Sequence, residues 1–155
     1  MGQGGETRSR AQPEPGPAQR VTLRCHNGSW LIDSVVPTSP TIVPASDRVA
    51  DLRPDERVGA WFDVVDRSGR TLYRRRLDDP HYFVIDEHVG ERTVARGARP
   101  SEPRLSVLAP VPAGGGRLEV YVASPPEGEP GPSTGPARLV AIVQLNSGLD
   151  DPHER

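Results

Sequence analysis

The chain has 155 residues, a formal net charge of −2 and a hydrophobic share of 34%, with 16 glycines and 18 prolines. This length and composition fit one modest globular domain with flexible additions and argue against two domains. All 19 basic residues are arginine, which excludes enzymes that need a Schiff-base lysine, a lysine general base or the phosphate-loop lysine of nucleotide hydrolases.

The two ends of the chain differ in composition from its centre. Residues 1–19 contain no large aliphatic or aromatic side chain after Met1, and such a segment cannot bury enough apolar surface to offset its chain entropy. We therefore predict a disordered N-terminal tail there and a shorter C-terminal tail at 147–155. The folded domain is expected at 20–146, with a flexible Pro/Gly-rich loop at 124–136.

Within this domain, apolar and polar residues alternate in short runs that turn residues separate, a pattern typical of β-strands. Strands are predicted at 20–25 and 29–36, and the Asn27-Gly28 turn is expected to join them as a hairpin. The segment 37–54 contains four prolines. It is therefore expected to be an edge strand or a crossing loop.

The clearest predicted hairpin joins strands at 58–66 and 70–77. If Arg67-Ser68-Gly69 form a three-residue loop, Val64 lies opposite Leu72, and successive residues alternate between the two faces. One face then carries Trp61, Asp63, Val65, Tyr73 and Arg75, and the other carries Phe62, Val64, Arg70, Leu72 and Arg74.

Two assignments of the core follow from this register. In the favoured one, Trp61, Tyr73 and Leu77 are buried, because a tryptophan between sheets is common in sandwiches. In the other, Phe62 lies in the core, and Trp61, Tyr73 and Arg75 stand together on the surface as residue types enriched at binding hot spots. Trp61, Tyr73 and Arg75 are therefore candidate partner-binding residues.

The rest of the domain continues the strand pattern. Four further strands are predicted, at 82–85, 91–95, 104–109 and 117–123, and the last two are expected to pair as a hairpin. The final strand, 137–145, is apolar on both faces, so we expect it to be central or covered. Val140 and Ile142 on its second face are therefore added as candidate partner-binding residues.

About eight short strands with turns between them predict an all-β fold. A two-sheet antiparallel sandwich of the immunoglobulin-like or fibronectin-like kind is the first choice, because a sheet this apolar must bury one face against another layer. An open barrel is the second choice.

The candidates for catalysis are few. Cys25 is the single cysteine, so neither an intramolecular disulfide nor a cysteine-rich zinc site is expected. Neighbouring strand residues point to opposite faces, so Cys25 and His26 cannot act as nucleophile and base, and Cys25 is expected in the core. The chain has no Gly-x-Ser-x-Gly elbow and no glycine-rich loop that leads into a helix. No catalytic residue and no cofactor is predicted.

One group of side chains could in principle hold a divalent metal. Its members are oxygen and imidazole ligands close together in the sequence: Asp78, Asp79, His81, Asp86, Glu87 and His88. Their spacing matches no known metal motif, and the tight histidine pairs of such motifs are missing. We expect a polar loop beside an edge strand and predict no metal site.

The charge pattern also limits the partners and the location. The 19 arginines are balanced by 21 acidic residues scattered through the same segments, which gives no general attraction to nucleic acid. No apolar run approaches the length of a membrane span, and no secretory signal is recognisable, so a cytoplasmic location is expected. The absence of lysine is typical of GC-rich coding sequences and points to a bacterial source.

Two segments carry a resemblance to a known family. The run Trp-Phe-Asp-Val-Val-Asp-Arg-Ser-Gly-Arg-Thr-Leu-Tyr-Arg-Arg at 61–75, with Leu-Asp-Asp-Pro at 77–80, resembles a hairpin of bacterial immunoglobulin-like sandwich domains. The run Pro-Ala-Gly-Gly-Gly-Arg-Leu-Glu-Val-Tyr at 112–121 is similar to their penultimate strands. Some of these domains lie beside secreted peptidases, and an adjoining peptidase domain is not expected here. The resemblance implies the fold and no catalytic residue.

The expected function is that of a non-enzymatic adaptor in a bacterial multi-component system. It would bind another protein, a neighbouring gene product being one candidate, through a sheet face or by strand addition at an exposed edge. One alternative is a small metal-dependent hydrolase that uses His81, Asp86 and His88. The other is a carbohydrate-binding module with Trp61 and Tyr73 as a stacking platform. The sequence predicts no particular oligomeric state.

Overall fold

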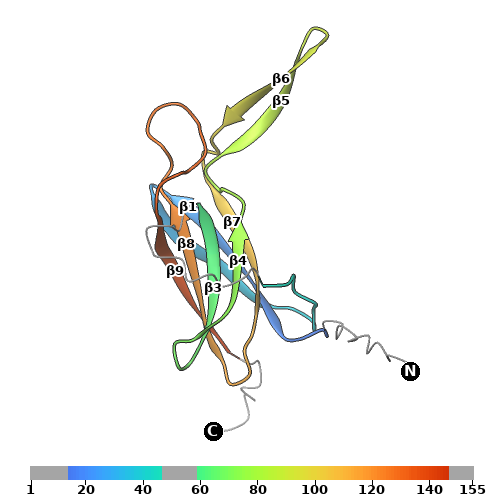
Figure 1. Cartoon of the computed structure of the whole chain (residues 1–155), viewed down its shortest axis with the longest axis vertical. Helices are drawn as coiled ribbons and strands as arrows, with labels where there is room; N and C mark the ends of the chain where they lie inside the picture. Colours follow the sequence, from blue (N-terminus) through green and yellow to red (C-terminus); the bar gives the residue numbers. More distant parts are fainter. Residues whose placement is uncertain (1–13, 47–58, 147–155) are drawn as a thin grey trace, which may run out of the picture.

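The computed structural model describes residues 14–46 and 59–146. Over these ranges the fold is all-β without a helix, and nine strands form three antiparallel sheets (Figure 1). The predicted all-β class is therefore confirmed. Apart from residues 14–19, the two predicted tails lie outside the described residues, and the first strand begins at Ala18.

The first sheet has three strands in the order β2-β1-β7. Their bounds are Ala18–His26 for β1, Ser29–Pro37 for β2 and Arg104–Pro110 for β7. The predicted hairpin between β1 and β2 is present, and both Asn27 and Gly28 have the positive φ that a tight two-residue turn requires. In β2 the pairing shifts beside Asp33, whose carboxylate accepts a 2.7 Å bond from Arg24 on β1.

The second sheet has four strands in the order β4-β3-β8-β9. Their bounds are Ala60–Asp66 for β3, Thr71–Leu77 for β4, Gly116–Ala123 for β8 and Ala137–Leu145 for β9. The predicted hairpin between the strands now labelled β7 and β8 is wrong, because these strands belong to different sheets and their connection crosses between them. The last strand was expected to be central or covered, but β9 lies at an edge of its sheet, and Leu139 and Ile142 on it are about half exposed.

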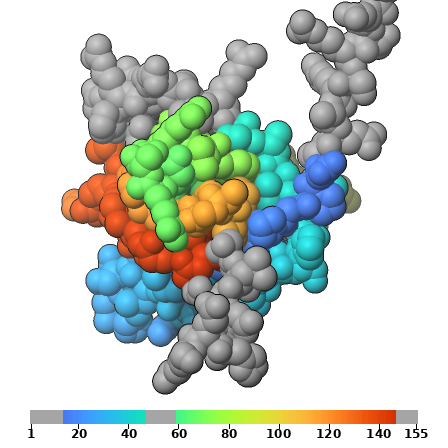
Figure 2. Space-filling model, turned by 90° about the horizontal axis from the view of Figure 1, so that it is seen from below, coloured from blue at the N-terminus to red at the C-terminus, as the bar shows by residue number. Residues whose placement is uncertain are grey.

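Both larger sheets contribute to one hydrophobic core. Its aliphatic and aromatic members include Val21, Leu23, Phe62, Val64, Tyr73, Leu105, Val107, Leu118, Val120, Val143 and Leu145. Strands β2 and β9 also contact each other. Figure 2 views the molecule from below and shows red residues of the C-terminal strand beside blue residues of the N-terminal sheet. The strongest constraint on the fold is therefore the burial of one face of each larger sheet.

The register of the β3–β4 hairpin differs from the predicted one by a single residue. Near the turn the prediction is right, because Val65 pairs with Thr71. The pairing then shifts, so that Val64 pairs with Tyr73, and Leu72 is the extra residue of a β-bulge. Every β4 residue beyond the bulge consequently points to the face opposite the predicted one.

The turn of this hairpin is held by Asp66 and Gly69. One carboxylate oxygen of Asp66 accepts hydrogen bonds from the amides of Ser68 and Arg70, both at 2.9 Å, and from the Ser68 hydroxyl at 2.6 Å. The hydrogen bond from the Ser68 hydroxyl is the largest of the contributions that lower the pKa of Asp66. Gly69 has φ +89° and donates its amide to the Asp66 carbonyl at 3.1 Å.

The third sheet is a two-stranded ribbon, formed by β5 (Phe83–Val89) and β6 (Arg92–Ala98). It projects from one end of the body along the long axis of the molecule (Figure 1). Both strands are longer than the predicted segments 82–85 and 91–95. Because β5 and β6 pair only with each other, they do not join the larger sheets. The two larger sheets together have seven strands, where the sequence predicted about eight for the sandwich.

The connection between β8 and β9 arches beside the base of the ribbon (Figure 1). Asp79 attaches it at one point by accepting the Ser133 amide at 2.7 Å and the Ser133 hydroxyl at 3.2 Å. At a second point Arg99 donates to the carbonyl of Pro126 at 2.6 Å. The segment 124–136, predicted as a flexible loop, is thus tied to both roots of the ribbon.

No helix in the described parts of the chain is long and apolar enough to cross a membrane.

Gly69→Val tests the turn. We expect it to lower the free energy of unfolding by about 1–2 kcal/mol, because a β-branched residue is strained at positive φ. Gly135→Val is the matched control, since Gly135 has no positive φ and a Cβ there meets no atom within 4 Å. Urea unfolding measures both variants. Equal stability of Gly69→Val and the wild type would contradict the assigned turn.

Candidate functional site

Trp61, the first predicted binding residue, lies on the face of its sheet that points away from the shared core. Its ring stacks on Tyr121 from β8, with 4.5 Å between centroids and 22° between planes. The guanidinium of Arg74 lies 4.6 Å from the centre of the Trp61 ring. Trp61 is only 6% exposed, so it does not stand out from the surface as a hot-spot residue would.

The arginine over this indole belongs to a buried ion pair. Arg74 donates from Nε and Nη2 to the two carboxylate oxygens of Asp63, at 2.6 and 2.8 Å. Both side chains are buried, and the two parallel bonds are the strong bidentate arrangement of a guanidinium and a carboxylate. This pair is a consequence of the bulge at Leu72, because Asp63 faces Arg74 only in the shifted register.

Tyr73 and Arg75 lie on the opposite face of the same hairpin. Tyr73 is 8% exposed, its ring lies 5.7 Å from that of Phe62, and its hydroxyl donates to the Pro44 carbonyl at 2.6 Å. Arg75 donates to the carbonyl of Ala45 at 3.0 Å. Each predicted assignment of the hairpin faces is thus right only in part. Phe62 lies in the shared core as in the second, and Trp61 and Tyr73 are both buried as in the first, but on different sides of the sheet. The two rings do not form a stacking platform for a carbohydrate.

The two candidates on the last strand occupy different environments. Val140 stands where the β8–β9 register shifts, and it packs partly buried against the core. Ile142 pairs with Glu119 and is 49% exposed. The five predicted residues thus do not form one surface, and the role of each in binding stays a prediction.

The predicted metal ligands are also separated. Asp79 binds Ser133 and accepts the backbone amide of His81 at 2.9 Å. His88 lies on the ribbon and shares a 3.2 Å hydrogen bond with Thr93. Within residues 14–46 and 59–146, no three histidine, cysteine or acidic side chains lie close enough to hold a metal ion.

An apolar surface that the sequence reading missed lies on the ribbon. Directly paired residues share a face, so one face combines Phe83, Ile85 and Val89 from β5 with Val94 from β6. All four side chains are exposed, from 36% for Ile85 to 61% for Val89. We call these four residues the ribbon face. Glu87 and Arg96 lie among them and form an ion pair with each other at 3.1 Å.

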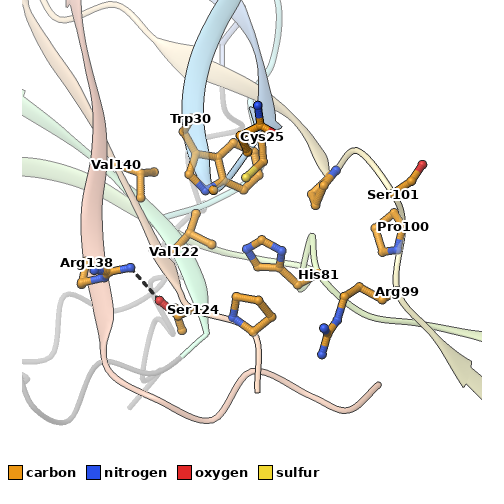
Figure 3. A pocket seen from close by; sticks show the side chains of 15 residues that line it. Cys25, Trp30, His81, Arg99, Pro100, Ser101, Val122, Ser124, Arg138 and Val140 are labelled. Atoms are coloured by element: carbon orange, nitrogen blue, oxygen red, sulfur yellow. Dashed lines mark hydrogen bonds between the residues drawn. The ribbon is translucent and has the colours of Figure 1, made fainter. Parts of the chain in front are cut away.

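A pocket of about 450 Å³ lies where the ribbon joins the body (Figure 3). Loops from both larger sheets form its walls. The β1–β2 hairpin contributes Cys25 and Trp30, and the connection into β5 contributes His81. The segment after β6 contributes Arg99, and β9 contributes Arg138. Sequence reasoning singled out Cys25 and His81 separately, but residues so distant in the chain meet only through the fold.

His81 is one of two buried titratable groups, with Cys25, among the described residues that line this pocket. Its ring lies 5.8 Å from that of Trp30 in an edge-on arrangement. Burial lowers the pKa of His81, and the charge of Arg99 lowers it further, whereas Asp79 acts in the opposite direction. The imidazole is therefore neutral at pH 7.

Cys25 is a poor candidate for a nucleophile in this pocket. Burial raises the pKa of its thiol, although a hydrogen bond from the Gly28 backbone acts in the opposite direction. A protonated thiol is a poor nucleophile. The raised pKa of the Cys25 thiol therefore favours binding over thiol chemistry in this pocket.

Neither a protein-family model, nor a curated protein, nor a solved structure matches this chain. Function must therefore be argued from the chemistry of these surfaces.

Arg74→Lys tests the buried ion pair. We expect it to lower the free energy of unfolding by about 1–3 kcal/mol, because an ammonium group cannot form both parallel bonds to Asp63 or stack on the indole. Arg70→Lys, at an exposed position of the turn, is the matched control. Urea unfolding would show equal stability for both variants if the pair were unimportant.

His81 gives a prediction for pH dependence. Since its pKa is lowered in the folded state, the unfolded chain binds the proton more readily, and the free energy of unfolding should fall as the pH drops below about 6.5. The decline should level off below the pKa of the folded state. His81→Gln should remove this part of the pH dependence, whereas His88→Gln should keep it. Unfolding curves that keep the same decline in His81→Gln would refute the assignment.

Proposed function

We propose that this chain is a non-enzymatic interaction module that binds another protein through the ribbon face. The observation that carries the proposal is the exposure of Phe83, Ile85, Val89 and Val94 together on one face of a projecting ribbon. Monomeric proteins seldom expose several large apolar side chains side by side, and such groups mark interaction sites.

The stability of the ribbon supports the same proposal. A two-stranded ribbon alone is marginally stable in water, and three or more strands or a packing partner are normally needed. Burying a half-exposed valine or phenylalanine completely contributes about 1 kcal/mol. Four such side chains, held by one rigid element, offset part of the entropy cost of association.

The charges of the ribbon indicate what kind of surface the partner presents. Glu87 and Arg96 neutralise each other across the two strands. The ribbon face therefore has apolar groups around a self-paired ion pair, and Arg92 opposite Val89 adds one positive charge near the tip. We expect the partner to offer an apolar groove rather than a strongly charged one, and a product of a neighbouring gene remains the first candidate.

We also propose that the two larger sheets form an immunoglobulin-like sandwich. The shared core of both sheets and the antiparallel pairing of all their strands support this assignment. The first strand, β1, occupies the centre of its sheet rather than an edge. In this arrangement the sandwich is a rigid base that presents the ribbon.

Val89→Asp tests the proposed function. Val89 lies near the tip of the ribbon opposite Arg92, so a charge there should leave the body folded. It should weaken capture of the partner at least about tenfold, because a partner that covers this apolar surface must desolvate the new carboxylate even where Arg92 pairs with it. Leu72→Asp, at an exposed apolar position of the β4 bulge, is the matched control. Pulldown with candidate neighbouring gene products, followed by affinity measurement, compares the variants.

The expected result is a protein held by the wild type and by Leu72→Asp but lost from Val89→Asp. Size-exclusion chromatography covers the case in which that protein is a second copy. A partner that binds Val89→Asp as tightly as the wild type would refute the ribbon face. A chain that stays monomeric and binds none of these candidates would refute the interaction role.

A further inference from the structure

The pocket at the base of the ribbon has the size and the lining of a small-molecule site. Its volume of about 450 Å³ lies within the range of ligand pockets in proteins. One part of its wall is apolar, with Trp30, Val122 and Val140 (Figure 3). Prolines at 100, 103 and 125 extend that wall. Such flat and rigid groups favour a ligand with a flat apolar body.

The charged groups of the pocket are all of one sign. Arg99 and Arg138 lie on either side of His81 (Figure 3). No aspartate or glutamate belongs to the described residues that line the pocket. With His81 neutral, the two guanidinium groups give the pocket a net positive charge.

Arg99 and Arg138 differ from the arginines that form ion pairs, and like Arg20 and Arg75 they donate to neutral acceptors. Arg74, Arg96 and Arg117 each pair with a carboxylate. Arg99 instead donates to the Pro126 carbonyl, and Arg138 donates to the Ser124 hydroxyl, both at 2.6 Å and both to neutral acceptors. Neither forms an ion pair within the described parts of the chain. A guanidinium has five N–H donors, so each retains donors for an anion.

We propose that this pocket binds a small organic carboxylate with a flat apolar body. The body lies against Trp30 and Val140, and the carboxylate lies between Arg138 and Arg99. Guanidinium groups match the geometry of a carboxylate and bind it through charge-assisted hydrogen bonds. This site is distinct from the ribbon face, because none of the four residues of that face lines the pocket.

The carboxylate could belong to a free organic acid or to the C-terminus of a bound peptide, and both have the same chemistry at the arginines. Two probes separate these cases: benzoate, and the tripeptide Gly-Gly-Phe with a free C-terminus. Their neutral controls are benzamide and the tripeptide with an amidated C-terminus. Tighter binding of the free tripeptide than of benzoate indicates a peptide terminus. The reverse order indicates a free acid.

The experiment is a titration of the full chain, labelled with ¹⁵N, followed by NMR. Benzoate should cause saturable shifts of the Trp30 indole N–H and of the Ser101 and Ser124 amides, with a dissociation constant of about 1 mM or tighter. Benzamide should not. The double variant Arg99→Gln/Arg138→Gln should bind benzoate at least tenfold more weakly. Arg92→Gln/Arg104→Gln removes the same charge outside the pocket and should bind like the wild type.

A second measurement needs no variant. Benzoate bound beside His81 should raise the pKa of the imidazole, because a nearby anion favours the protonated ring.

Absence of saturable shifts with both benzoate and the free tripeptide would overturn the proposal. Equal binding of benzamide would overturn it as well, and so would unchanged benzoate affinity in Arg99→Gln/Arg138→Gln.

Discussion

A single extra residue in β4 decides which side chains of the β3–β4 hairpin reach the shared core. Because Leu72 bulges out of the ladder, Tyr73 joins Phe62 on the core side, and Arg74 reaches Asp63 on the other side. β3 is consequently buried on both faces. Apolar side chains cover the face toward the shared core, and the Asp63–Arg74 ion pair lies beside Trp61 on the opposite face. Without this bulge, three arginines in succession would place two of their charges against the shared core.

The strands were largely predictable from the sequence, whereas their assembly was not. Alternation of apolar and polar residues identified β1, β3 and β8, and the Asn27-Gly28 turn identified the first hairpin, because these signals are local. Membership of a sheet depends on contacts between distant segments. The Pro- and Gly-rich connection between β7 and β8 is compatible with a hairpin or a crossing, and only the burial of both sheets decides between them. The bulge at Leu72 has no local signal either, since Leu72 and Tyr73 are both plausible core residues.

The candidate surfaces could likewise not be predicted from local sequence patterns. Phe83 and Ile85 suggested a weak strand, but their exposure follows from the projection of the ribbon, which alternation alone does not predict. His81 looked like one member of an acidic and histidine-rich cluster. In the fold its backbone is bound by Asp79, and its ring meets Trp30 from another sheet. The pocket is made of loop ends from many elements, and that is why residue spacing could not reveal it.

The ribbon and the pocket depend on the same short anchoring segments. Tyr82 lies against Gly97 so closely that a Cβ at position 97 would meet its ring at 2.6 Å, so the root of the ribbon tolerates only glycine without a shift. Next to this contact, His81 and Arg99 flank the two strands and line the pocket. Arg99 also carries the bond to Pro126 that ties the β8–β9 connection to the ribbon. The carboxylate of the proposed ligand would therefore contact the same side chain that carries this bond. The proposed ligand site and the proposed interaction surface in this way share the anchoring segments of the ribbon, although their chemistries differ.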